Sequence, residues 1–121
     1  MPTHEMAKTA LSASLCGVIA RKKGETIGMV RAVGDGVMKV YIQDMIVDIA
    51  NRRAGVGRRL MSAIISDLSE RCPASCMIGL FAAEGRSEFY TQLGFQSRPE
   101  IGFGPGMHGT LSELAKPRNG A

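Results

Sequence analysis

The stretch "NRRAGVGRRL", residues 51–60, decides how this sequence is interpreted. It places four arginines around two glycines, and it lies between the apolar run "VYIQDMIVDIA" (40–50) and an amphipathic run. A strand that leads through a glycine-rich turn into a helix directs backbone N–H groups at one place, where the helix N-terminus adds about half a positive charge. Glycine lets a ligand approach the backbone closely, and arginine binds phosphate oxygens in a bidentate manner. The stretch therefore predicts an anion site, most simply for a phosphate or pyrophosphate.

Length and composition predict one ordinary globular domain. The chain has 121 residues, of which 45% are hydrophobic and 21% charged, and we expect a single domain over 1–121 with a disordered tail at 116–121. The net charge is +4, and the sequence has few aromatic residues, with 4 Phe, 2 Tyr and no Trp. A local cluster of arginines without aromatic stacking platforms favours a small anionic ligand and argues against a nucleic-acid partner.

The cysteines and the N-terminal residues indicate where in the cell the protein works. The sequence has three cysteines, Cys16, Cys72 and Cys76, an odd number that cannot all pair within one chain. Their spacing is not that of a zinc site, so we expect no disulfide framework and no metal. Cys72 and Cys76 are interpreted as small hydrophobic residues rather than nucleophiles. Residues 1–15 lack the continuous apolar core of a signal peptide, and no apolar run approaches the roughly 20 residues that span a bilayer. We therefore expect a cytoplasmic protein with no membrane partner.

Hydrophobic periodicity predicts a mixed α/β fold. The predicted elements are a helix at 4–15, strands at 17–22, 26–33 and 37–47, a helix at 57–71, a strand at 74–82, a helix at 84–94 and then one or two last strands. Tight turns join the first three strands into an antiparallel meander. The strand at 37–47, the helix at 57–71 and the strand at 74–82 form a β-α-β unit with parallel strands. We expect helices on both faces of this central mixed sheet.

Two familiar phosphate loops do not match the stretch. A P-loop needs Lys and Ser or Thr after its second glycine, and the dinucleotide fingerprint needs a third glycine where this chain has Leu60. The pattern that fits is Arg52-x-x-Gly55-x-Gly57. It resembles the signature Arg/Gln-x-x-Gly-x-Gly/Ala of the GCN5-related N-acetyltransferases, in which this loop holds the pyrophosphate of acetyl-coenzyme A.

Further matches extend the resemblance over roughly residues 15–107. "YIQDMIVD" (41–48) is similar to the family's fourth strand, and "EFYTQLGF" (88–95) is similar to its second hallmark helix. The resemblance implies a sheet in which the meander and the β-α-β unit are followed by a C-terminal α-β segment. Two departures stand out. The family's first strand and most of its first helix are expected to be missing, and Ala83 stands where the family commonly has Asn.

The resemblance also implies a set of site residues. The loop that would hold the pyrophosphate through its backbone N–H groups comprises Arg52, Arg53, Ala54, Gly55, Val56, Gly57 and Arg58. The backbone of Met45, Ile46 and Val47 would pair with the pantetheine arm in the manner of an added strand. Tyr90 would act as the general acid that protonates the departing thiolate.

The general base has several candidates. Asp44 lies on the predicted central strand next to the cofactor-binding end, and a carboxylate there could accept the proton of the amine. Its alternative role is that of a structural hydrogen-bond partner. Glu84 and Glu88 flank the second hallmark helix, and His108 is a weaker candidate in a glycine-rich loop.

The sequence thus predicts an acetyl-coenzyme A dependent N-acetyltransferase in which a primary amine attacks the thioester directly. The acceptor is open between a small amine, an amino sugar, and a protein N-terminus or lysine. An alternative is a non-catalytic acyl-coenzyme A binding module of the same fold, and a nucleic-acid-binding protein is the least favoured alternative. We also consider a homodimer, since dimers are common in the family that the sequence resembles.

Overall fold

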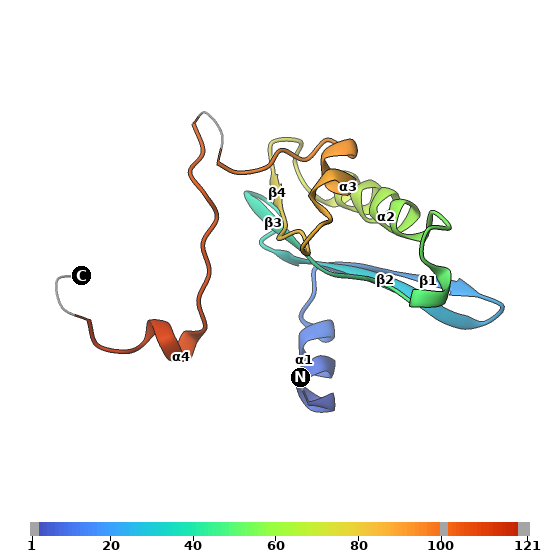
Figure 1. Ribbon diagram of the computed structural model, residues 1–121, viewed down its shortest axis with the longest axis horizontal. Helices are drawn as coiled ribbons and strands as arrows, with labels where there is room; N and C mark the ends of the chain where they lie inside the picture. The colour runs from blue at the N-terminus through green and yellow to red at the C-terminus, as the bar shows by residue number, and fades with distance from the viewer. Residues whose placement is uncertain (1–2, 100–101, 119–121) are drawn as a thin grey trace. The chain divides into compact units, whose positions relative to one another are not determined.

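The computed structural model describes residues 3–99 and 102–118. The chain divides into two compact units, the first ending at Phe81 and the second beginning at Ala82. The first unit holds the sheet and its covering helix, and the second holds two short helices (Figure 1).

The sheet of the first unit has four strands in the order β1-β2-β3-β4. These are β1 (Cys16–Lys22), β2 (Glu25–Gly34), β3 (Lys39–Val47) and β4 (Met77–Gly79). β1 and β3 both pair antiparallel with β2, whereas β3 and β4 pair parallel. The predicted meander and β-α-β unit are therefore confirmed, and together they make a mixed sheet.

Helix α2 (Val56–Arg71) covers one face of this sheet and contacts β1, β2 and β3, as Figure 1 shows. Its apolar stripe supplies the buried side chains Leu60, Met61, Ile64 and Leu68. The facing strands contribute Val30, Ala32, Val40 and Ile42, each at most 4% exposed. Helix and sheet approach closely at Gly28, where an added Cβ would lie 3.1 Å from Leu60 Cδ1. Removing this apolar surface from water is the main source of stability in the unit.

A bulge interrupts the pairing of β2 with β3. Arg31 pairs with Gln43 and Met29 pairs with Ile46, so one residue of β2 faces two of β3 across the break. Asp44 lies within the break, and its φ of 54° falls in the left-handed region that few residues other than glycine adopt. The apolar pattern of 37–47 predicts a strand and carries no local sign of an extra residue.

The N-terminal helix α1 (His4–Ser12) is shorter than the predicted 4–15. Thr3 caps it, since its side-chain oxygen accepts from the backbone N–H of Met6 at 3.1 Å. After the helix, the backbone N–H of Leu15 donates to Ala32 O at 2.8 Å, which joins the connecting segment to β2. A short 3-10 helix, η1 (Ile49–Asn51), follows β3 and leads toward α2.

The second unit contains α3 (Ser87–Gln92) and α4 (Leu111–Leu114). The predicted helix at 84–94 begins later than expected because Gly85, with φ 81°, forms a turn, and the predicted stop at Gly94 is confirmed by its φ of 105°.

Two strand predictions need correction. The strand predicted at 74–82 is limited to β4, and the last strand predicted after Gly94 has no counterpart in residues 95–99 and 102–118, where Phe103 forms a single bridge. The segment 102–109 is rich in glycine and contains a proline, a composition that disfavours strands. Part of the tail predicted at 116–121 lies outside the described residues.

Candidate functional site

The loop singled out in the sequence lies between η1 and the first turn of α2. Gly55 is the N-cap of α2 with φ 83°, and no side chain caps the helix there. Arg59 N–H donates to Gly55 O at 3.1 Å, which ties the helix to its N-cap residue. Val56 and Gly57 begin the first turn of α2, where the regular i to i−4 pairing of a helix leaves its first N–H groups without a partner inside the helix. An added Cβ at Gly55 would meet no atom within 4 Å, so the backbone of the helix start is open to a ligand.

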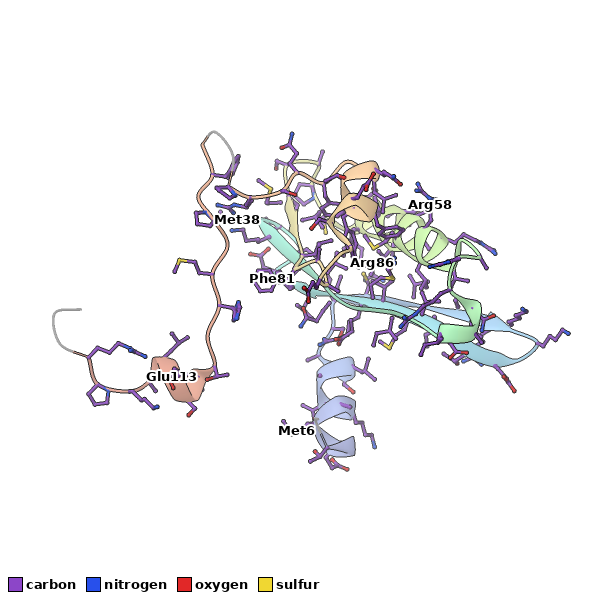
Figure 2. The ribbon with its side chains drawn as sticks, in the orientation of Figure 1. Met6, Met38, Arg58, Phe81, Arg86 and Glu113 are labelled. Atoms are coloured by element: carbon purple, nitrogen blue, oxygen red, sulfur yellow. The ribbon has the colours of Figure 1, made fainter. Side chains whose placement is uncertain are left out.

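Positive charge surrounds this helix start. The side chains of Arg52, Arg53, Arg58 and Arg59 are exposed, and the first turn of α2 contains no acidic residue. Figure 2 shows Arg58 on the first turn of α2. The N-terminus of a helix is the positive end of its dipole, and the arginine side chains are positive as well. The electrostatics of the loop therefore favour an anion.

The second part of the site is the open edge of β3. Pairing with β4 covers Lys39, Val40 and Tyr41 and no later residue, so within the described residues β3 continues beyond the end of β4. Asp48 N–H donates to Ile27 O on β2 at 2.7 Å. Antiparallel pairing alternates along a strand, so the main-chain groups of Val47, one residue earlier, face away from β2 toward the open edge.

The structure joins these two parts directly. Arg52, the first residue of the predicted loop signature, donates from Nε to the main-chain oxygen of Val47 at 3.2 Å. The predicted residues Met45, Ile46 and Val47 and the predicted loop 52–58 therefore lie next to one another at one end of β3. An extended ligand with an anionic end would find main-chain partners along the strand and N–H groups at the helix start.

Tyr90, the predicted general acid, lies in α3 of the second unit. Its side chain is buried, with 9% of the residue exposed, and its ring makes edge-on contacts with Phe89 and Phe95 at centroid distances of 5.0 and 6.0 Å. Burial raises the pKa of the Tyr90 phenol above its ordinary value, and the smaller effect of Arg86 lowers it. The phenol is therefore protonated at neutral pH, as a general acid must be.

Asp44, the predicted base, lies in the bulge of β3 and forms an ion pair with Arg31. Its Oδ2 accepts from Arg31 Nε at 2.7 Å, and its side chain is 46% exposed. Arg31 was not singled out in the sequence, since an arginine at an alternating strand position looks like any solvated residue. The other carboxylates considered as bases, Glu84 and Glu88, are exposed and lie in the second unit.

Other site types have little support among the residues that the structure describes. They contain no group of three or more His, Cys, Asp or Glu side chains that could hold a metal ion. Cys16, Cys72 and Cys76 are all free thiols. Burial raises the pKa of Cys16, and a hydrogen bond with Asp67 adds to this increase. In this part of the chain, no helix combines the length and the apolar character needed to cross a membrane.

Comparison with known proteins agrees with this geometry. The family model "Acetyltransferase (GNAT) domain" matches residues 13–97. GCN5-related N-acetyltransferase 1, chloroplastic, from Arabidopsis thaliana is 33% identical over 72% of this chain and 43% of its own length. Serotonin N-acetyltransferase 2, chloroplastic, from Oryza sativa subsp. japonica is 31% identical over 64% of this chain and 38% of its own length.

Solved structures share the fold. A probable acetyltransferase from Staphylococcus aureus superimposes with a TM-score of 0.79 at 27% identity, covering 90% of this chain and 80% of that one. The chain spans less than half the length of the curated relatives it matches. The match to the family model nevertheless covers more than half of the chain, including β3, the arginine–glycine loop and α3. This chain therefore belongs to the GNAT acetyltransferase family.

Proposed function

We propose that the protein is an acetyl-coenzyme A dependent N-acetyltransferase that transfers the acetyl group to a primary amine by direct attack. The observation that carries the proposal is the uncapped start of α2 beside the open edge of β3. These two features suit a ligand that has a pyrophosphate at one end and an extended, amide-containing arm at the other. Family membership supports the same class of reaction.

The described residues fit such a ligand. The left-handed Gly55 leaves open space where a side chain would project, so phosphate oxygens can reach the N–H groups of residues 53–58. Arg52 and Arg53 add positive charge at the surface of the loop. In the proposal, the main chain of Met45 and Val47 pairs with the pantetheine arm as a neighbouring strand would. When bound, acetyl-coenzyme A supplies an acetyl group activated as a thioester.

Two groups of the chain are assigned to the chemistry. A main-chain N–H near Val47 stabilises the negative charge that develops on the carbonyl oxygen, since a fixed donor stabilises charge without reorganising. Tyr90 holds a proton on its hydroxyl oxygen and delivers it to the departing sulfur. A base role for Asp44 stays a prediction, because the Arg31 guanidinium already occupies one oxygen of this carboxylate.

The acceptor is proposed at the level of a primary amine. A relative named serotonin N-acetyltransferase acts, by its name, on an amine of this kind. A small amine, an amino sugar and a protein N-terminus or lysine remain the classes to be assayed. A cytoplasmic location and a homodimer stay predictions as well.

The assignment of Tyr90 is tested by Tyr90→Phe, assayed for turnover with a panel of these amines and for acetyl-coenzyme A binding by calorimetry. We expect kcat to fall by about 10²- to 10⁴-fold with the dissociation constant of acetyl-coenzyme A unchanged, because the variant loses an acid and keeps the ring. The residual activity should not depend on titration of a phenol. In the unmodified protein, the alkaline fall in kcat should lie above the ordinary tyrosine pKa of about 10, since burial raises the pKa of Tyr90.

The chain offers a matched control for this test. The chain has 2 tyrosines, and the other one is Tyr41. The Tyr41 ring packs against Phe81 at a centroid distance of 5.3 Å. Tyr41→Phe removes the same hydroxyl group and is expected to leave kcat within about threefold, because it removes no group that touches the reacting atoms. Full turnover in Tyr90→Phe would exclude the acid role. Binding without turnover in the unmodified protein would favour the non-catalytic module.

A further inference from the structure

We infer that Arg31 and Asp44 are positioning residues, whose ion pair holds the bulge that directs the main-chain groups of Met45 and Val47 to the open edge of β3. The inference rests on the proposed function, because it treats this edge as the binding surface for the arm of acetyl-coenzyme A. It assigns Asp44 a role different from that of the general base.

The bulge changes which residues of β3 face the open edge. Before the bulge, Asp35 N–H donates to Lys39 O, so residues 39, 41 and 43 form the hydrogen-bonded pairs with β2, and residues 40 and 42 face β4. After it, Ile46 and Asp48 face β2, since Asp48 N–H donates to Ile27 O at 2.7 Å. One extra residue therefore changes the outward set from even to odd positions. Without it, residues 44 and 46 would face the edge instead of 45 and 47.

The extra residue is held by its own backbone preference and by an ion pair. Asp44 has φ 54°, a conformation that asparagine and aspartate tolerate better than most residues do. Its Oδ2 accepts from Arg31 Nε at 2.7 Å, a short charge-assisted hydrogen bond that runs across the bulge from β2 to β3. Arg31 also pairs with Gln43, the last residue of β3 in regular register before the bulge.

The Arg31 side chain has a fixed orientation. It is only 13% exposed. Its Nη1 donates to Ser14 Oγ at 3.2 Å and to Ala10 O at 3.5 Å, and Ser14 Oγ in turn donates to Ala10 O at 3.1 Å. These contacts join the C-terminal end of α1 to the guanidinium that holds Asp44. The arginine is thus restrained from two sides, unlike the partner of an ordinary exposed ion pair.

A positioning role and a base role predict different binding behaviour. A base acts on the amine, so its loss leaves the affinity for acetyl-coenzyme A unchanged. Loss of the bulge misaligns the main-chain partners of the arm and weakens that affinity. The affinity for 3′-phospho-ADP, which carries the pyrophosphate and no arm, stays the same, because the α2 start does not involve Asp44.

The experiment is calorimetric titration of Asp44→Ala, Asp44→Asn and Arg31→Gln with acetyl-coenzyme A and with 3′-phospho-ADP. Loss of one or two main-chain hydrogen bonds predicts about tenfold weaker acetyl-coenzyme A binding in Asp44→Ala and in Arg31→Gln, with 3′-phospho-ADP binding unchanged. Asparagine tolerates the left-handed conformation and keeps an oxygen for Arg31 Nε. Asp44→Asn is therefore expected to bind acetyl-coenzyme A within about threefold of the unmodified protein.

The matched control is Asp67→Ala. Asp67 Oδ1 accepts from Arg71 Nε at 2.9 Å, so the same two residue types form the same kind of pair within the regular helix α2. This variant should bind both ligands as the unmodified protein does. Unchanged acetyl-coenzyme A affinity in both Asp44→Ala and Arg31→Gln would overturn the inference, as would an equal loss of affinity for the two ligands. If Asp44→Ala does not fold, the acetyl-coenzyme A affinity of Arg31→Gln alone decides between these outcomes.

Amide hydrogen exchange separates the inference from the proposed function. If the unmodified protein bound neither ligand, the proposed function would fail. The positioning claim would still predict faster exchange at the Ile46 and Asp48 amides in Asp44→Ala than in Asp67→Ala, because these amides bond to β2 only in the bulged register. Equal protection in the two variants would contradict it.

Discussion

At the scale of single residues, backbone conformation shapes the site as much as side-chain chemistry does. Gly55 and Asp44 both lie at positive φ, at 83° and 54°. The first was predictable, because two glycines spaced one residue apart before an amphipathic run mark a special turn. The second was not, because an aspartate in a strand carries no local sign of a bulge. Its carboxylate pairs with Arg31, which is distant in sequence and therefore invisible to a local pattern.

The Asp35 carboxylate holds the turn between β2 and β3. Its Oδ1 accepts from the backbone N–H groups of Val37, Met38 and Lys39 at 2.8, 2.8 and 3.1 Å. The hydrogen bond from Lys39 N–H, followed by those from Val37 and Met38, lowers the pKa of this carboxyl below its ordinary value. A carboxyl whose pKa is lower in the folded state stabilises the fold above its unfolded pKa of about 3.9. The stabilisation is lost as the pH falls through the folded value.

Asp35→Asn should therefore reduce the loss of stability between about pH 5 and pH 2, because the amide does not titrate there. Urea unfolding at a series of pH values measures this directly. The variant should be less stable than the unmodified protein near neutral pH, and the two curves should converge in acid. Curves that remained parallel across this range would show that Asp35 is not a source of the acid sensitivity.

At the scale of elements, the sequence predicted best where periodicity is long and regular. The predicted helix at 57–71 and the strand at 37–47 match α2 and β3 within a few residues. The strand predicted at 74–82 was too long, because an apolar run signals burial whether or not the chain is paired as a strand. The ends of the β3–β4 pairing and the register of the bulge arise from contacts between elements. These are the features that create the open edge of the site.

Two neighbouring isoleucines of α2 test how the helix is held. Ile64 is 0% exposed in the core, whereas Ile65 is 37% exposed. We expect Ile64→Ala to lower the free energy of unfolding by about 2–5 kcal/mol, through lost apolar burial and the cavity that remains. Ile65→Ala removes the same atoms at the surface and should cost less than about 1 kcal/mol. Urea denaturation compares the two, and similar losses would contradict the placement of the helix on the sheet.

At the scale of the whole molecule, the proposed roles fall in both units. The loop and the β3 edge belong to the unit that ends at Phe81, and Tyr90 belongs to the unit that begins at Ala82. The family match spans this division, since it covers residues 13–97. In the proposed function, residues of the first unit bind the pyrophosphate and the arm and Tyr90 of the second unit delivers the proton, so binding and turnover can be examined with separate variants.

The most direct test of the central claim is calorimetric titration of the full chain with acetyl-coenzyme A, beside coenzyme A without the acetyl group. We predict a dissociation constant in the micromolar range, and loss of binding in Gly55→Glu, where a carboxylate occupies the open helix start. Gly24→Glu is the matched control, because Gly24 also has a positive φ, 81°, and open space but lies in the β1–β2 turn. Binding that disappears in Gly55→Glu and persists in Gly24→Glu would support the pyrophosphate site. No binding to the unmodified chain at millimolar ligand, or equal binding in both variants, would contradict it.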